Sequence, residues 1–170
     1  GELTGFMAIK TDITERRRAE TQIRALVGVQ SAILQNAAYA IIATRTDGII
    51  TQFNRAAESL LGYTAAELVD VQTPGIFHDP AEVVARAAEA SAELGVTIEP
   101  GFEVFVARAR RKLPDEREWT YIRKDGERRQ VLLSITALRD EADHITGFLG
   151  MALDVTQRRV AERQLAASQQ

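Results

Sequence analysis

The stretch TDGIITQFNRAAESLLGYTAAEL, residues 46–68, decides the fold. Asp47 and Gly48 separate two apolar runs, and this dipeptide readily adopts the positive φ angles of a two-residue β-turn. Asn54 follows the second run, and its side-chain oxygen can accept a hydrogen bond from a free N–H at a helix start. The stretch therefore predicts a β-hairpin followed by a short helix that ends at Gly62.

Two more helices are predicted after this stretch. Thr64 and Glu67 have the spacing of a capping box, in which each side chain accepts a hydrogen bond from the other residue's backbone N–H. Asp79 and Pro80 are favourable at a helix start and precede an Ala-rich segment, residues 81–94. These signals predict a short helical turn and then a longer helix.

The last third of the chain predicts a three-strand meander. Strand-forming runs occupy residues 118–123, 128–139 and 145–153, separated by short polar turns. Residues 102–112 alternate between helical and strand character, so they receive no assignment. The hairpin, the helices and the meander together predict an α+β domain with one antiparallel sheet and helices on one face.

The two ends of the chain repeat each other. TGFMAIKTDITERRRAETQI, residues 4–23, aligns without a gap on TGFLGMALDVTQRRVAERQL, residues 146–165. Each copy predicts a strand, an Asp-x-Thr tripeptide and then a helix, over residues 15–36 in the first copy and from residue 157 to the end in the second. The repeat predicts a tandem array of modules, of which this chain is an excised piece.

The first of these helices has apolar residues on one face. The spacing favours a coiled coil with a second copy of the chain, although Gln30 interrupts the apolar pattern. A seam that packs on its own domain is the alternative. The residues of the seam are Ala19, Ile23, Leu26, Ile33 and Ala37.

The composition argues against several classes of protein. The chain has 170 residues, a formal net charge of -3 with acids and bases interspersed, and no Cys. A nucleic-acid surface needs a basic face, so no nucleic-acid partner is expected. The absence of Cys suits a cytoplasmic protein and excludes disulfides and Cys-ligated metals. No apolar run approaches the roughly 20 residues that cross a bilayer, so no membrane contact is expected.

The order of the motifs resembles the PAS sensor domains of bacterial signalling proteins. The resemblance rests on residues 46–68, on EWTYIRKDGERRQVLLSITAL at 118–138, and on ITGFLGMALDVTQRR at 145–159. It covers about residues 31–159. The family implies a five-stranded antiparallel sheet wrapped over a small apolar pocket, and a role as a sensor or dimerisation module between other domains.

The resemblance also implies domain boundaries. Residues 1–14 resemble the last strand and Asp-Ile-Thr end of a preceding PAS domain, residues 15–36 a linker helix, residues 37–156 a PAS domain, and residues 157–170 the start of a second linker helix. In the full-length protein, neighbouring PAS domains and an output domain are implied. The output domain is expected to be a histidine kinase, as in two-component systems, or a cyclic-dinucleotide enzyme.

The two Asp-x-Thr tripeptides resemble the junction between the last strand and the output helix in this family. The resemblance gives a signal-relay role to Asp154, Val155 and Thr156, and to Asp12 and Thr14 in the first copy. The expected mechanism is that a change in the pocket moves the last strand, and that the junction passes the shift to the helix.

Several residues are candidates for the pocket. Trp119 and Tyr121 are able to stack on a ring system, or to pack the sheet against its helices. Ser134 is a candidate hydrogen-bond donor in the pocket, with a solvent-facing hydroxyl as the alternative. His78 is expected to cap the following helix or to face water, with haem ligation as the less favoured alternative. The full set of candidates is Asn54, His78, Trp119, Tyr121, Ser134 and Phe148.

The resemblance leaves the cofactor open. Haem-binding members coordinate iron through a His in the long helix before the meander, and residues 81–94 contain no His. Blue-light sensing members form a cysteinyl–flavin bond at an Asn-Cys-Arg-Phe motif that this sequence lacks. Haem and covalent flavin are therefore not expected, and noncovalent flavin or a small metabolite remains open.

The sequence predicts a sensory and signal-relay module that forms a homodimer through its linker helices. It shows no general acid/base arrangement and no metal-ligand spacing, so no catalytic and no metal-binding residues are assigned. The alternative function is a ligand-free dimerisation or interaction module whose pocket is filled by its own side chains.

Overall fold

The computed structural model describes residues 15–22, 24 and 39–168. The chain divides into two compact units, residues 1–36 and 37–170. In the first unit, the described residues 15–22 and 24 are helical, which agrees with the predicted helix. The strand predicted before this helix, together with Asp12 and Thr14, lies outside the described residues.

The second unit begins with the predicted hairpin. Strands β1 (Ala40–Thr44) and β2 (Ile50–Phe53) pair antiparallel. The prediction of a two-residue turn is wrong, because Arg45 N donates to Ile49 O and the loop consists of residues 46–48. Of Asp47 and Gly48, only Gly48 has a positive φ, 93°, a value that residues with a Cβ rarely adopt. Asn54 then caps helix α2 (Arg55–Leu61) by accepting a hydrogen bond from the N–H of Ala57.

The next elements also begin where the sequence predicts. Helix α3 (Ala65–Leu68) has both hydrogen bonds of the capping box between Thr64 and Glu67. A 3-10 helix, η1 (Pro74–Phe77), precedes helix α4 (Pro80–Leu94), whose N-cap is Asp79.

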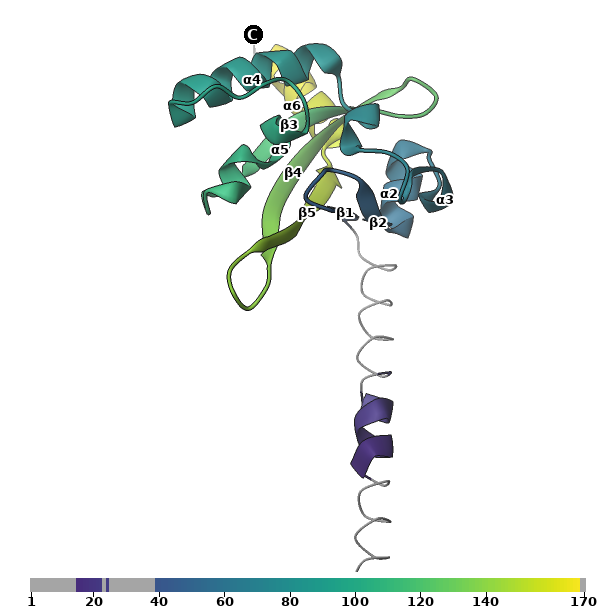
Figure 1. Cartoon of the computed structure of the whole chain (residues 1–170). Helices are drawn as coiled ribbons and strands as arrows, with labels where there is room; N and C mark the ends of the chain where they lie inside the picture. The colour runs from purple at the N-terminus through teal and green to yellow at the C-terminus, as the bar shows by residue number, and fades with distance from the viewer. Residues whose placement is uncertain (1–14, 23, 25–38, 169–170) are drawn as a thin grey trace, which may run out of the picture. The chain divides into compact units, whose positions relative to one another are not determined.

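Helix α5 (Phe102–Arg110) occupies the segment that the sequence left without an assignment. Its residues Val104 to Ala107 are all buried, so the helix lacks the alternation of apolar and polar faces that identifies a surface helix. In Figure 1, α5 lies beside α4 and packs against β4 (Arg128–Arg139).

The meander completes the sheet. Strands β3 (Glu116–Ile122), β4 and β5 (Ile145–Asp154) give a five-stranded sheet in the order β2-β1-β5-β4-β3. All four neighbouring pairs are antiparallel, so the predicted fold class is confirmed. Helix α6 (Thr156–Ser168) follows β5 after one residue, Val155.

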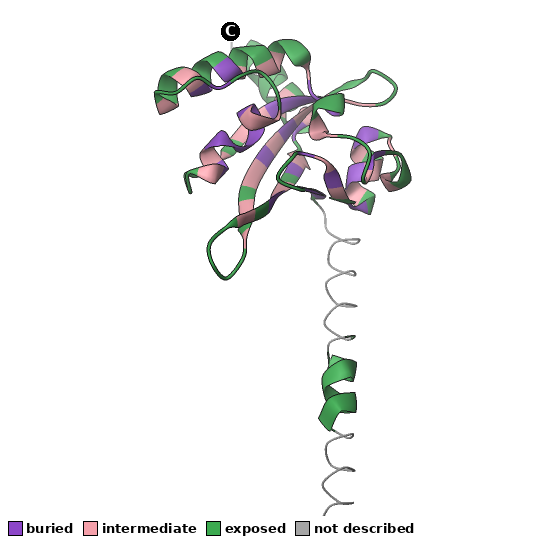
Figure 2. Ribbon diagram, viewed as in Figure 1, coloured by how far each residue is buried: buried purple, intermediate pink, exposed green. Residues whose placement is uncertain are grey.

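The buried side chains gather between the sheet and the helices. Figure 2 shows buried residues on the strands and on α2 and α5, whereas α6 has no buried residue. The largest fully buried side chains are Tyr121, Phe77, Phe148, Ile50, Leu61, Leu68, Val106 and Val131.

Strand β5 approaches β1 very closely at Gly147. A Cβ at this position would overlap the carbonyl oxygen of Thr44. Gly147 therefore allows the two central strands to pair at this point.

Candidate functional site

A small cavity lies between the sheet and the helices. Side chains alternate between the two faces of a strand, so Ile42 and Thr44 of β1 reach the same face as Leu133 and Ile135 of β4. Its volume is about 40 Å³.

The wall of the cavity is almost entirely apolar. The strands supply aliphatic and aromatic residues, and α5 and the segment around η1 close the cavity opposite the sheet. The lining residues are Ile42, Thr44, Pro74, Phe77, His78, Phe102, Phe105, Val106, Tyr121, Leu133, Ile135, Phe148 and Gly150.

His78 is the main correction to the sequence-based expectations for the site. Its side chain does not cap α4 or face water, because His78 is only 3% exposed and Asp79 caps the helix instead. An isolated β-bridge to Tyr121 fixes the backbone of His78 against β3 and turns the ring inward.

Aromatic rings surround the imidazole of His78. Its ring centre lies 4.1 Å from that of Phe105, 4.9 Å from that of Tyr121 and 5.4 Å from that of Trp119. Burial in this environment disfavours the imidazolium and lowers the pKa of His78 to about 4. Burial also raises the pKa of the Tyr121 hydroxyl. Both side chains are therefore neutral at pH 7.

The structure brings three of the six pocket candidates together. His78, Tyr121 and Phe148 line the cavity. Trp119 is buried beside His78 and packs under the guanidinium of Arg86, 5.0 Å from its ring centre, so it has the packing role that the sequence allowed.

The other two candidates lie elsewhere. Asn54 joins β1 to α2, since its side-chain oxygen accepts hydrogen bonds from Ile41 N and Ala57 N. Ser134 alternates with Leu133 and Ile135 along β4, so it lies on the opposite face of the sheet.

Most residues of the wall were not among the pocket candidates, and three of those missed are notable. Thr44 is one, although the alternation of Ala40, Ile42 and Thr44 along β1 was a usable signal. Phe102 and Phe105 are the others, and their spacing of three residues places both on one side of α5.

The cavity limits which cofactors fit. Sites for drug-sized ligands are typically about 300–1,000 Å³, so a volume of about 40 Å³ is too small for the ring system of a flavin or a haem. The described residues also contain no cluster of three His, Asp or Glu side chains that could hold a metal ion.

The junction after β5 forms the second part of the site. Asp154 accepts a hydrogen bond from the N–H of Thr156 at 2.9 Å, which stabilises the turn into α6. The hydroxyl of Thr156 accepts one from the N–H of Gln130 at 2.9 Å, and Val155 N donates to the carbonyl of Gln130 at 2.8 Å. The start of α6 is therefore attached to β4 as well as to β5.

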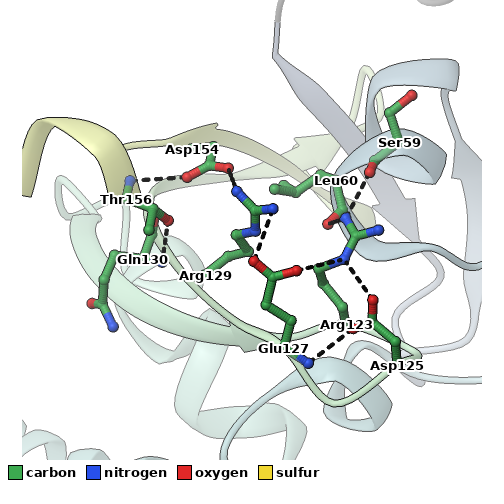
Figure 3. Close-up of polar contacts among 9 residues, drawn as sticks. All are labelled: Ser59, Leu60, Arg123, Asp125, Glu127, Arg129, Gln130, Asp154 and Thr156. Carbon is green, nitrogen blue, oxygen red and sulfur yellow. Dashed lines mark hydrogen bonds and ion pairs between the residues drawn. The ribbon is translucent and has the colours of Figure 1, made fainter. Parts of the chain in front are cut away.

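A chain of charged side chains extends from the junction to α2 (Figure 3). Arg129 lies between Asp154, at 3.4 Å, and Glu127, at 3.0 Å. Glu127 is also 3.8 Å from Arg123.

Arg123 forms the far end of this chain of charges. Its guanidinium donates to the carbonyls of Ser59 and Leu60, at 2.8 and 2.6 Å, in the last turn of α2. A cation is favourable there because the carbonyls at the end of a helix carry partial negative charge.

Helix α6 makes one further described contact with the sheet. Arg159 forms an ion pair with Glu118 of β3. Beyond Arg159 every described residue of α6 is exposed. No helix in the described part of the chain is long and apolar enough to span a membrane.

A family model described as PAS fold matches residues 30–155. A comparison with curated protein sequences found no match.

Solved structures share the fold. The PAS domain of a protein from Colwellia psychrerythraea has 18% identity and a TM-score of 0.57, and the match covers 78% of this chain and 98% of that one. The PAS domain of an HTR-like protein from Haloarcula marismortui has 21% identity and a TM-score of 0.56, with 81% and 98% covered. A domain of a sensory box sensor histidine kinase/response regulator from Geobacter sulfurreducens has 20% identity and a TM-score of 0.53, with 78% and 96% covered.

Proposed function

The chain belongs to the PAS family, and from this premise we propose that it is a sensory and signal-relay module of a signal-transduction protein. A molecule that binds in the cavity shifts β4 and β5, and the junction passes the shift to α6. One observation carries the proposal: strands β4 and β5 contribute residues to both the cavity wall and the junction. Strand β5 contributes Phe148 and Gly150 to the wall and Asp154 to the junction.

The path between the two sites is short. Gly150 and Asp154 are four residues apart on one strand, a distance of about 13 Å at the usual rise per residue. Strand β4 provides a second path, from Leu133 in the cavity wall to Gln130. The backbone of Gln130 is hydrogen-bonded to Val155 and Thr156. A displacement of either strand at the cavity therefore changes the support of the first turn of α6.

We propose that α6 pairs with the same helix of a second chain. Its apolar residues Ala161 and Leu165 are four residues apart, so they lie on one face of the helix, and both are exposed, Leu165 to 61%. Pairing would bury this surface. Because two helices can pair in more than one geometry, the helix pair could switch between two arrangements when the signal arrives. Sedimentation equilibrium tests this: we expect a mass of two chains, and a shift toward one chain in Leu165→Glu.

The module is proposed to act within a larger cytoplasmic protein, between another PAS domain and an output domain with kinase or cyclic-dinucleotide activity. The Geobacter sulfurreducens domain with the same fold belongs to a sensor histidine kinase/response regulator, which supports this context. In this proposal the segment itself transmits a change in shape and catalyses no reaction.

A substitution that mimics occupancy tests the proposal. Gly150→Ala adds a methyl group to the cavity wall, and the new Cβ would lie 3.5 Å from its nearest neighbours, an ordinary contact distance. We expect the backbone amide chemical shifts of the first turn of α6 to change. Gly75→Ala is the matched control, because it also adds a methyl group at ordinary contact distance but outside the cavity wall.

The outcome separates the two candidate functions. Shifts in α6 with Gly150→Ala, but not with Gly75→Ala, support the relay. Shifts confined to the strands around Gly150 would contradict it and favour the ligand-free structural module.

A further inference from the structure

Two polar atoms of the cavity wall have no hydrogen-bond partner among the described residues: His78 Nε2 and Thr44 Oγ1. The two residues line the same cavity and are 3% and 6% exposed. Buried polar atoms in proteins are nearly always paired. Two unpaired atoms in one largely apolar cavity therefore indicate a molecule bound in the cavity that supplies the partners.

The hydrogen bond at His78 Nδ1 determines whether the unpaired Nε2 donates or accepts a hydrogen bond. Nδ1 lies 2.7 Å from the carbonyl oxygen of Pro74. Because a carbonyl oxygen only accepts hydrogen bonds, Nδ1 carries the proton of the neutral ring. Nε2 therefore has a lone pair, and its partner has to be a hydrogen-bond donor.

The rest of the wall defines the charge and size of the ligand. Among the described residues, none with a charged side chain lines the cavity. An ion would lose its hydration there without gaining a counter-charge, so the ligand is neutral. A volume of about 40 Å³ has room for roughly three water molecules, which limits the ligand to a few non-hydrogen atoms.

We propose that the cavity binds a small neutral molecule that donates an N–H or O–H hydrogen bond to His78 Nε2 and places a second polar atom against Thr44 Oγ1. The Thr44 hydroxyl both donates and accepts, so the second atom is an oxygen or a nitrogen. The inference rests on the proposed function, since it names the class of molecule that the sensor takes.

Acetamide and acetate form a matched pair of probes. They have nearly the same shape, but acetamide is neutral and carries N–H donors, whereas acetate is an anion that only accepts hydrogen bonds. The experiment is a titration of the 170-residue chain with each probe, followed by the amide signals of the strands and of α6 in ¹H–¹⁵N spectra.

We expect saturable shifts around Thr44 and His78 with acetamide and none with acetate. Thr44→Val keeps the side-chain shape and removes the hydroxyl, so binding should weaken about tenfold, the factor expected for one lost hydrogen bond. His78→Phe should abolish binding. If His78→Phe does not fold, Thr44→Val still provides the test.

Three results would overturn the ligand class: no saturable shift with acetamide, equal binding of acetate, or unchanged acetamide affinity in Thr44→Val. The amide chemical shifts of α6 show which of the two proposals fails, the class of ligand or the relay to α6. Acetamide binding that leaves α6 unchanged contradicts the relay alone. Absence of binding, with α6 still responding to Gly150→Ala, contradicts the ligand class alone.

Discussion

The cavity and the junction share strands β4 and β5 but differ in their chemistry. The cavity wall is buried and largely apolar, and two of its polar side chains, Thr44 and His78, have atoms without described partners. The junction is polar and partly exposed, and both Asp154 and Thr156 are hydrogen-bonded within the domain. The cavity therefore has polar atoms that need a partner from outside the described residues, whereas Asp154 and Thr156 of the junction already have theirs.

This difference should separate effects on stability from effects on the proposed relay. Burial of aromatic and aliphatic groups supplies most of the folding free energy, so the cavity region is expected to dominate stability. Exposed ion pairs contribute little, so the polar chain from Asp154 to Arg123 can rearrange without unfolding the domain. Substitutions in the two regions should consequently have very different effects.

The largest difference is expected from truncation of the cavity wall. Phe148 is 2% exposed, so Phe148→Ala should lower the free energy of unfolding by about 3–5 kcal/mol. Glu127→Gln removes a charge from the polar chain, where the side chain is 53% exposed, and should change stability by less than about 1 kcal/mol. Urea denaturation measures both values. Similar losses in the two variants would remove the distinction between the regions.

The pH dependence of stability should come next in size. The pKa of His78 is about 4 in the folded state and 6.5 in the unfolded state. The unfolded chain therefore takes up a proton first, and stability is lost as the pH falls from 6.5 to 4, by about 3 kcal/mol in total.

Two variants isolate this contribution. His78→Asn keeps an N–H donor for Pro74 and does not titrate, so it should lose less stability than the wild type between pH 7 and pH 4. His144→Gln is the control, because it removes an imidazole that is 79% exposed and lies outside the cavity. If the stability of His78→Asn fell with pH as much as that of the wild type, His78 would not be buried in the neutral form.

The same substitution should have opposite signs in the two regions. Thr44→Val removes a buried hydroxyl without a described partner and is expected to stabilise the free protein by about 1 kcal/mol. Thr156→Val removes the acceptor for Gln130 N and should destabilise it by about 1 kcal/mol. Thermal or urea unfolding of both variants measures the signs. Destabilisation by Thr44→Val would indicate that its hydroxyl already has a partner.

The smallest effect on stability is expected from Asp154→Asn. This variant keeps the shape of the side chain but loses the ion pair with Arg129, which contributes less than about 1 kcal/mol. It should nevertheless weaken the hydrogen bond to Thr156 N and increase hydrogen exchange in the first turn of α6. Unchanged exchange in α6 would show that the carboxylate does not hold the junction.

The sequence predicted the elements that local signals specify. The hairpin around Asp47-Gly48 and the caps at Asn54, Thr64 and Asp79 all depend on neighbouring residues, and each is present in the structure. The hairpin loop is longer than predicted, because it consists of residues 46–48. Helix α5 was not predicted, because burial of four consecutive residues removes its periodicity.

The site was only partly predictable for a different reason. Asp154 and Thr156 belong to a motif that recurs within the chain, which made them candidates for a junction, and the structure places them at the end of β5 and the start of α6. Their role in a relay stays a prediction. Whether His78 faced water or the core depended on a bridge to Tyr121, 43 residues later in the sequence, and no local signal specifies such a contact. Thr44 joined the site through its strand register with β5, which is equally nonlocal.

The most direct test of the account is whether the junction is required for the cavity to affect α6. The measurement is the change in α6 amide chemical shifts caused by Gly150→Ala, made once in the wild type and once in Thr156→Val. We predict that the α6 response is largely lost in Thr156→Val, while the response of Ile42 and Leu133 in the cavity wall keeps its size. An α6 response of equal size in both backgrounds would contradict relay through the junction.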